Sequence, residues 1–331
     1  RKESEVALLL DQQNAVVQKE SIGAVELARK GIDNAAAAVT KISGISKQEG
    51  GGNVYVRGLG DRYQNTTYNG LPLPSNDIDK KNIDLGLFSS DLIQNIGVSK
   101  TYASNFYGDF AAGNVDIVSK EYTGDFFIES TLGTGINTNA QGENFVRSEG
   151  TSFFGYYNRY NNNPFATIIQ NGFDPVDGGS PVNISGKITG GNSWDIGDQS
   201  RLSVFATASF SNGFEYREGQ AANFTIVEDV VFPNAEEYVY NTNTTALLNL
   251  TYRINSYHKL KFNSVFINDA TDEVGYFGTE GQGRNRDAIL DTDEGFYVSN
   301  IQFDQDMIFV NQLVGTHKLD EKLNLELYSS S

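Results

Sequence analysis

The stretch Leu202-Ser203-Val204-Phe205-Ala206-Thr207-Ala208-Ser209-Phe210 largely alternates between apolar and small polar side chains. A period of two is typical of a β-strand with one apolar and one polar face. The same alternation recurs at 126–132, 184–189, 245–252, 260–266 and 323–327, with a less regular run at 301–318. The sequence after about residue 122 therefore predicts about seven strands of an antiparallel sheet.

The connections between these runs alternate in length. They run long, short, long, short, long, short: 137–181, 193–199, 214–242, 255–256, 271–300 and 320–321. An outer-membrane β-barrel has this pattern, with short periplasmic turns and long external loops. Only a closed barrel satisfies every strand in a bilayer, so seven strands predict further strands beyond Ser331.

The first 120 residues instead mix short helical and strand signals. Ser21 is placed to cap a helix that ends at Gly31, and Asp33 or Asn34 to cap a second helix over 35–41. Shorter elements are expected as strands at 54–57, 96–99 and 115–118, and as a brief helix over 92–94. We therefore expect a small α+β domain at 1–121, with 1–16 as an N-terminal extension, and barrel strands over 122–331.

Composition excludes several classes of function. The chain has 331 residues, 25 Lys and Arg against 42 Asp and Glu, and a net charge of −17, which disfavours binding to nucleic acid phosphates. It contains no cysteine, which removes disulfides, thiolate metal sites and cysteine nucleophiles. No stretch approaches the roughly 20 apolar residues of a membrane helix.

Several ordered blocks of the N-terminal region resemble the plug domain of TonB-dependent outer-membrane receptors. They are Val54-Tyr55-Val56-Arg57-Gly58-Leu59-Gly60-Asp61-Arg62-Tyr63, Asn69-Gly70-Leu71-Pro72-Leu73-Pro74-Ser75, residues 87–93, 96–100, and the run from Gly108 to Lys120. The resemblance is to a subgroup frequent in Bacteroidota and Proteobacteria. One departure is Gly113-Asn114, where the family often has two glycines. A second is that no clear TonB box is visible in 1–16.

The resemblance implies a plug inside a 22-stranded barrel in the outer membrane of a Gram-negative bacterium. TonB with its ExbB/ExbD motor, outer-membrane lipids and a surface lipoprotein or other outer-membrane subunit are the implied partners. The implied function is TonB-driven import of a ligand that the sequence does not identify. The alternative is a receptor-like barrel that serves as a structural or scaffold subunit without active transport. A soluble all-β binding domain is disfavoured by the one-sided long connections.

The candidate site residues lie in the plug blocks and carry no catalysis. Arg57 is expected to act as a latch, paired with carboxylates of the inner barrel wall, since arginine binds carboxylates bidentately. The other plug-motif positions are Gly58, Gly60, Asn69, Gly70, Gly108 and Gly113. Gly58 and Gly60 do not open a dinucleotide fingerprint, because Tyr63 stands where the third glycine would be.

The remaining residues of chemical interest favour structural interpretations. His258 and His317 are 59 positions apart and are interpreted as polar-face or interface side chains rather than ligands. The acidic run 291–295 fails the EF-hand spacing, and Glu236-Glu237 lies in a segment of unknown shape. Tyrosines at 156, 157, 160, 238 and 240 suit either a membrane-interface girdle or ligand stacking. We predict no enzyme activity, no cofactor and no metal site.

The acidity is expected to lie on the outer side of the barrel. The three long connections contain 17 acidic and 5 basic residues, which places −12 of the −17 charge in them. If these segments are external, they would repel anionic ligands and attract cations or a basic partner.

Overall fold

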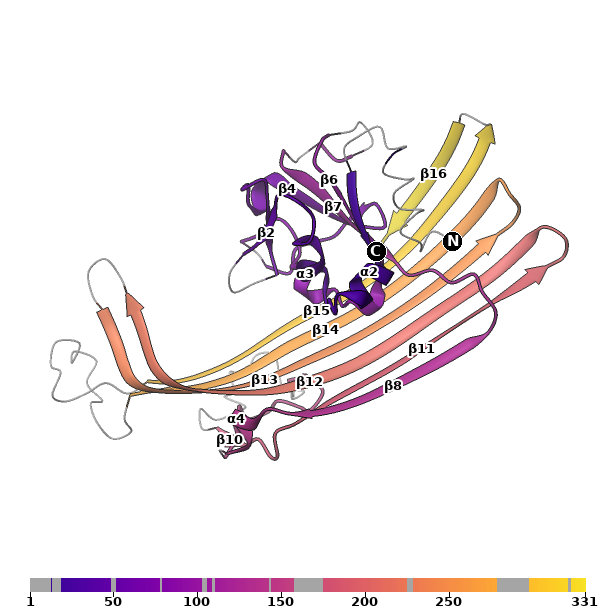
Figure 1. Ribbon diagram of the computed structural model, residues 1–331. Helices are drawn as coiled ribbons and strands as arrows, with labels where there is room; N and C mark the ends of the chain where they lie inside the picture. Colours follow the sequence, from indigo (N-terminus) through magenta and orange to yellow (C-terminus); the bar gives the residue numbers. More distant parts are fainter. Residues whose placement is uncertain are drawn as a thin grey trace, which may run out of the picture.

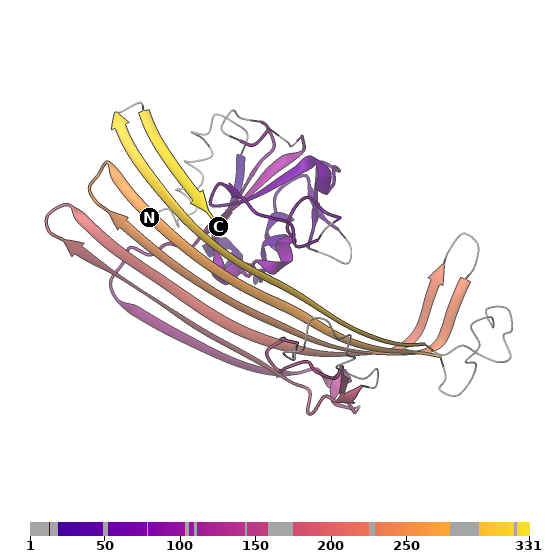
Figure 2. The same cartoon turned by 180° about the vertical axis from the view of Figure 1, so that it is seen from behind.

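The computed structural model describes residues 13, 19–48, 52–77, 79–102, 106–108, 111–142, 144–157, 175–224, 229–278, 298–320 and 323–331. A compact N-terminal domain lies on the concave face of a long, curved sheet (Figure 1). The view from behind shows the same arrangement, with the sheet extending well past the domain at one end (Figure 2). The described helices include none that is both long and apolar enough to cross a membrane.

The N-terminal domain is built on a five-stranded sheet in the order β1-β6-β7-β4-β5. Its strands pair antiparallel except for β4 and β7, which run parallel. The strands are β1 (Lys19–Gly23), β4 (Gln64–Tyr68), β5 (Leu71–Pro72), β6 (Ile93–Ser99) and β7 (Gly113–Ser119), and a separate hairpin joins β2 (Ile45–Lys47) to β3 (Val54–Val56). This confirms the small α+β domain.

Two short helices, α2 (Ala24–Arg29) and α3 (Ala35–Val39), cover this sheet. The predicted cap at Asn34 is confirmed, because its side chain accepts a hydrogen bond from the backbone N–H of Ala37 at 2.9 Å. The predicted cap at Ser21 is wrong. Residues 19–23 pair with β6, and burial of Ile22 in that sheet outweighs the local helical signal. Three single-turn 3₁₀ helices complete the domain, at Asp61–Tyr63, Leu85–Leu87 and Ser90–Leu92.

The long sheet contains seven strands, each antiparallel to its neighbour, in the order β16-β15-β14-β13-β12-β11-β8. They are β8 (Phe127–Ile136), β11 (Val182–Ile196), β12 (Ser200–Phe224), β13 (Asp229–Arg253), β14 (His258–Phe277), β15 (Val298–Asp320) and β16 (Leu323–Ser330). The seven predicted antiparallel strands are thus confirmed. In the described part of the chain they form an open sheet.

One predicted connection is wrong, and the connection predicted at 271–300 is shorter than expected, because β14 continues to Phe277 and β15 begins at Val298. Residues 214–242 are not a long loop, because β12 continues to Phe224 and β13 begins at Asp229. Aromatic pairs across the two strands extend the hairpin: the rings of Phe214 and Tyr240 are 4.6 Å apart, and those of Tyr216 and Tyr238 are 4.9 Å apart. Four acidic residues assigned to that loop, Glu215, Glu218, Glu236 and Glu237, therefore lie on strands. Residues 158–174 and 279–297, including the acidic run 291–295, lie outside the described residues.

The two faces of the long sheet have different environments. On the concave face, Phe205, Leu247, Val265, Ile267 and Val310 join the hydrophobic core of the N-terminal domain. The opposite face carries large apolar side chains that are exposed, among them Ile128, Leu132, Ile188, Phe309 and Leu313. The sheet therefore buries one face against the domain and leaves the other apolar and uncovered over much of its length.

The segment that follows β8 folds back onto the outer face of the sheet. It contains α4 (Thr138–Gln141), β9 (Val146–Arg147) and β10 (Val176–Asp177), and Figure 1 shows α4 and β10 on the side away from the N-terminal domain. Phe145 packs edge-on against Phe214 and Tyr238 at centroid distances of 5.0 and 5.6 Å. The long-loop end of the outer face is therefore covered by the chain itself.

The shared core predicts that substitutions on the inner face of the sheet lower the unfolding free energy more than substitutions on the outer face. Ile267→Ala removes a fully buried side chain between the sheet and the domain, so we expect a loss of about 2–5 kcal/mol in unfolding free energy. Limited proteolysis of the N-terminal domain at increasing urea in detergent checks this. The control, Phe309→Ala, removes an exposed outer-face ring and should leave proteolysis unchanged. Equal protection of the Ile267→Ala variant and the parent would contradict a shared core.

Candidate functional site

The N-terminal domain and the long sheet meet at a polar contact that we call the junction. On the domain side it consists of Asn69, Ser119 and Glu121. On the sheet side it consists of Lys259 and Lys261 of β14, Asn263 of β14 and Gln312 of β15. All these residues are linked by hydrogen bonds or ion pairs across the interface. Any displacement of the domain from the sheet would break these contacts, so the junction is the candidate functional site.

The turn between β4 and β5 brings Asn69 to the junction. Asn69 and Gly70 both have positive φ, 52° and 82°, as the predicted Asn-Gly hairpin turn requires. The carboxylate of Asp116 on β7 fixes the turn by accepting hydrogen bonds from the Thr67 hydroxyl at 2.7 Å and the Gly70 N–H at 2.8 Å. Burial raises the pKa of Asp116, and these two hydrogen bonds oppose that rise. The turn is therefore rigidly placed relative to β7.

Asn69 connects the turn to both the domain and the sheet. Its amide Nδ2 donates to Oε1 of Gln312 at 2.9 Å, while its Oδ1 accepts from the backbone N–H of Ser119 at 3.0 Å. Gln312 is 1% exposed, and its Nε2 donates to the backbone carbonyl of Tyr68 at 2.9 Å. The two amide side chains thus fix the position of the turn against β15.

A carboxylate clamp forms the second half of the junction. Glu121, two residues after the end of β7, forms ion pairs of 2.9 Å with Lys259 and 2.8 Å with Lys261. Burial by itself raises the pKa of Glu121, but the charges of Lys261 and Lys259 outweigh it and lower the pKa to about 2. Lys261 Nζ also lies 3.3 Å from the Ser119 hydroxyl oxygen, which is in turn 3.3 Å from Oδ1 of Asn263. The clamp is a charged, hydrogen-bonded network rather than an isolated pair.

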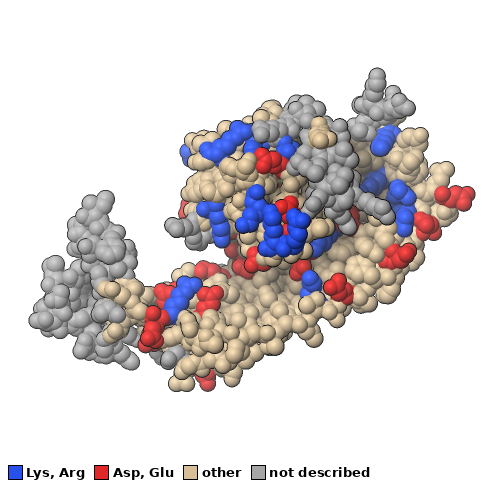
Figure 3. Space-filling model, in the orientation of Figure 1, with Lys and Arg blue, Asp and Glu red and all other residues tan. Residues whose placement is uncertain are grey.

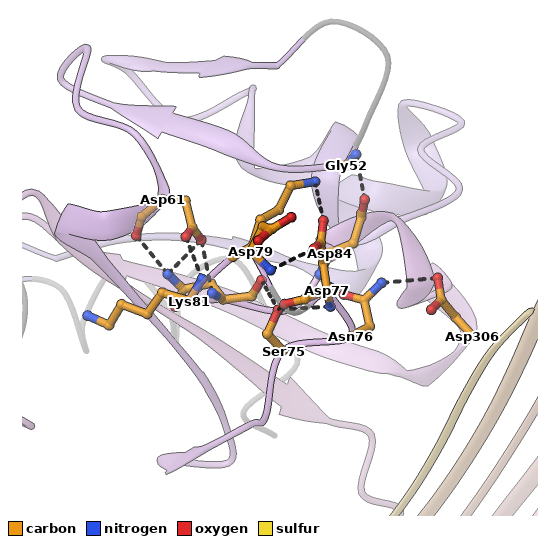
Figure 4. A network of polar contacts seen from close by, with 11 residues as sticks. Gly52, Asp61, Ser75, Asn76, Asp77, Asp79, Lys81, Asp84 and Asp306 are labelled. Carbon is orange, nitrogen blue, oxygen red and sulfur yellow. Dashed lines mark hydrogen bonds and ion pairs between the residues drawn. The ribbon is translucent and has the colours of Figure 1, made fainter. Parts of the chain in front are cut away.

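Further polar contacts connect other parts of the domain to the sheet. Lys187 of β11 forms an ion pair of 2.9 Å with Asp91, and Asp306 of β15 accepts a hydrogen bond of 3.0 Å from the Asn76 amide. Figure 4 shows Asn76 reaching Asp306 from a loop that is held by its own carboxylates. In that loop Asp61 accepts from the backbone N–H groups of 81 and 82, and Asp84 accepts from those of 52 and 86.

The predicted plug-motif residues are only partly brought together. Asn69 and Gly70 are at the junction, whereas Arg57 and Gly58 form the two-residue turn after β3, with φ of 54° and 74°. Gly60 precedes the first 3₁₀ helix. Two further positions differ in packing: Gly108 has open space around its Cα, whereas a Cβ at Gly113 would lie 3.1 Å from Val56 and 3.2 Å from the Ser99 carbonyl oxygen.

Arg57 itself points into solvent. Its side chain is exposed, and among the described residues no carboxylate forms an ion pair with it. Figure 3 shows several Lys and Arg side chains on the surface of the domain. The latch at Arg57 therefore stays a prediction. The predicted latch places the base on the domain and the acids on the sheet. In the ion pairs between Glu121 and the two lysines of β14, the acid belongs to the domain and the bases belong to the sheet.

Sequence reasoning missed the junction residues Glu121, Lys259, Lys261 and Gln312. A signal was present in the two lysines, which are spaced by two on the polar face of an expected strand. The partner at Glu121 is separated from them by more than 130 positions, and only the fold brings it close.

Two substitutions at Asn69 separate backbone strain from side-chain contacts. Asn69→Gly keeps a residue suited to positive φ but removes the hydrogen bonds to Gln312 and Ser119, so we expect a loss of about 1–3 kcal/mol. Asn69→Ala adds the cost of a left-handed backbone without glycine and should be less stable still. Urea titrations of both variants in detergent measure the difference. Equal stability of the parent and the glycine variant would exclude a contribution from the contacts to Gln312 and Ser119.

The clamp predicts an acid-dependent loosening of the junction. Because the pKa of Glu121 is lowered from 4.5 to about 2 on folding, its stabilisation is present above pH 4.5 and is lost as the pH falls through about 2. The maximum contribution is about 3 kcal/mol. Proteolysis of the domain against urea at several pH values checks this, with Glu121→Gln expected to lose the pH-dependent part. An identical pH profile in both proteins would contradict the clamp.

Comparisons with known proteins find one family model and several solved structures that are similar to this chain. Residues 11–115 match the model of the TonB-dependent receptor plug domain. A search of curated proteins finds no match. Solved structures similar to this chain include the siderophore receptor PiuA from Acinetobacter baumannii, with 13% identity and a TM-score of 0.46 over 95% of this chain and 45% of that one. Another is the ferric enterobactin receptor PfeA from Pseudomonas aeruginosa, with 12% identity and a TM-score of 0.35 over 97% and 62%.

The pyoverdine-bound receptor FpvA from P. aeruginosa is also similar, with 9% identity and a TM-score of 0.38 over 96% of this chain and 52% of that one. The chain therefore spans between 45% and 62% of the length of these three receptors. The family-model match covers most of the N-terminal domain, and the seven strands follow it. Residues 11–115 are thus identified by the family model as a TonB-dependent receptor plug domain, and the seven-stranded antiparallel sheet lies C-terminal to that match.

Proposed function

We propose that this chain is the plug and the adjoining wall of an outer-membrane receptor that imports a ligand by movement of the plug. The observation that carries the proposal is the junction, where a plug domain is held against the concave face of the sheet by exchangeable polar contacts. TonB with ExbB/ExbD is the proposed source of force. The proposed import makes and breaks no covalent bond, and the proposal does not specify the ligand.

The faces of the sheet support a membrane setting. The outer face carries exposed Ile128, Leu132, Ile188, Phe309 and Leu313, which suit contact with hydrocarbon in the outer membrane of a Gram-negative bacterium. The concave face is covered instead by the plug and by polar side chains. This distribution fits a wall between lipid on one side and a plugged lumen on the other.

The chemistry of the junction suits reversible release. Neutral hydrogen bonds contribute only about 0.5–1.5 kcal/mol each, because water replaces the lost partner. Asn69, Gln312 and Ser119 can therefore exchange partners with water when the plug is displaced. The Arg57 latch, the boundary of the plug at residue 121 and a surface lipoprotein partner remain part of this proposal.

Measuring the solvent accessibility of position 312 tests the proposal without knowledge of the ligand. These 331 residues contain no cysteine, so Gln312→Cys in the whole receptor adds a thiol at a position that is 1% exposed beneath the plug, and the parent receptor serves as the labelling background. We expect a membrane-impermeant maleimide in the periplasm to label it in growing cells with intact TonB, and to label it far less in cells that lack TonB.

The matched control is Ser256→Cys, at an exposed position in a short turn, which should react equally in both strains. A scaffold subunit without active transport would keep the thiol at 312 protected in both strains. That result, with normal labelling at 256, would reject plug movement driven by TonB.

A further inference from the structure

The two histidines of this chain face each other across the long sheet. His258 begins β14 and His317 lies near the end of β15, and the antiparallel register pairs them directly. Their Nδ1 atoms are 3.0 Å apart, and the ring centroids are 5.1 Å apart with an angle of 55° between the ring planes. The sequence interpretation, of two separate polar-face side chains, did not anticipate this pairing.

The backbone holds both rings in place. The Asn255 side chain accepts the backbone N–H of His258 at 2.9 Å, and the Tyr257 carbonyl oxygen accepts the backbone N–H of Lys318 at 2.8 Å. Gly315 leaves room for the second ring, because a Cβ there would lie 3.1 Å from Nε2 of His317. The turn before β14 therefore positions His258, and the absence of a side chain at Gly315 leaves space for the ring of His317.

The position of the pair separates it from the junction. His258 alternates with Lys259 along β14, so it points to the outer face, whereas Lys259 and Lys261 point to the plug. Both rings are half-buried beside the short turn at 254–257. The pair is thus reached from the rim of the sheet, independently of plug movement.

Two Nδ1 lone pairs repel each other at this distance unless a hydrogen or a metal ion lies between them. In the metal-free protein one ring carries its N–H hydrogen on Nδ1 and donates it to Nδ1 of the other ring. A metal ion is the alternative. Two ligands at about 2.0 Å from a metal are about 2.8 Å apart at a right angle and about 3.3 Å apart at a tetrahedral angle. The observed 3.0 Å lies between these two values and is nearer to the right-angle one.

We propose that His258 and His317 form a binding site for a divalent transition metal that favours square-planar coordination, with Cu²⁺ as the best fit. Imidazole nitrogens suit this ion, and it stands highest in the affinity order of the first-row divalent metals. Among the described residues no group of three or more His, Cys, Asp or Glu side chains is placed to hold a metal. The two histidines are therefore the protein ligands, and water fills the other positions.

Metal binding requires a change of tautomer but no oxidant or reductant. The histidine that carries its proton on Nδ1 moves that proton to Nε2 through solvent, and both Nδ1 lone pairs then face the metal. With both rings neutral at the start, the number of bound protons is unchanged and no electron is transferred.

The test is a Cu²⁺ titration of the purified protein in detergent, prepared without a histidine tag in a mildly alkaline buffer. We expect one tightly bound Cu²⁺ that depends on this pair, and an electron paramagnetic resonance spectrum with hyperfine coupling to two equivalent imidazole nitrogens. His258→Gln and His317→Gln should each lower the affinity by roughly tenfold or more, because each leaves a single imidazole. Gly315→Ala, which displaces the His317 ring, should also weaken binding.

The control variant is Lys318→Gln, which changes an exposed neighbour of His317 and should bind Cu²⁺ as the parent does. Resistance of each variant to urea shows that it is folded. Binding by the double His258→Gln, His317→Gln variant that equals the parent would overturn the proposal. So would loss of binding in only one of the two single variants, since the site needs both rings.

Discussion

The arrangement of this molecule depends on the burial of one face of the long sheet against the plug. Leu247, Val265 and Ile267 are almost fully buried, and they complete a hydrophobic core whose other members come from the plug. Each such side chain contributes about 1.5–3 kcal/mol when it leaves water. The outer face next to these residues carries exposed Leu248 and Phe309, so around them the sheet is apolar on both sides. The plug is thus part of what makes the concave face stable.

Apolar contact alone does not fix where the plug sits, because it has little directional preference. The hydrogen bonds and ion pairs of the junction have a preferred geometry and therefore fix the position of the plug. Gln312 has one arrangement in which its amide both accepts from Asn69 and donates to the Tyr68 carbonyl. Lys261 is nearly buried, and a buried ammonium is costly without a carboxylate partner. Glu121 therefore has a specific place at the end of β7, and a plug shifted by one residue would leave that charge unpaired.

Local signals in the sequence predicted local structure well. The Asn34 cap, the Asn69-Gly70 turn and the period of two along the strands each depend on neighbouring residues, and the structure confirms them. Features that depend on distant pairing were missed. Residues 19–23 form a strand only because β6 is beside them, and the His258–His317 pair depends on a register set across a connection of about 20 residues. In the same way, residues 214–242 appeared loop-like because glycine, asparagine and acidic residues interrupt an alternation that cross-strand aromatic pairs maintain.

Because β12 and β13 are longer than predicted, the acidic residues also lie in a different place from the one predicted. Acidic residues that the sequence predicts in a loop lie on strands, beyond the exposed apolar band. In that region the segment after β8 folds back and covers the outer face. There Asp272, 2% exposed, accepts hydrogen bonds from the Thr151 hydroxyl and the Ser148 N–H, and Arg147 lies 3.4 Å from it with its guanidinium 4.0 Å above the Tyr240 ring. A buried carboxylate with these partners needs a folded cover rather than lipid. The outer face is therefore divided along its length into an uncovered apolar part, suited to hydrocarbon, and a covered part with a polar core. In the proposed receptor, that division places the membrane against the half of the sheet that also holds the plug.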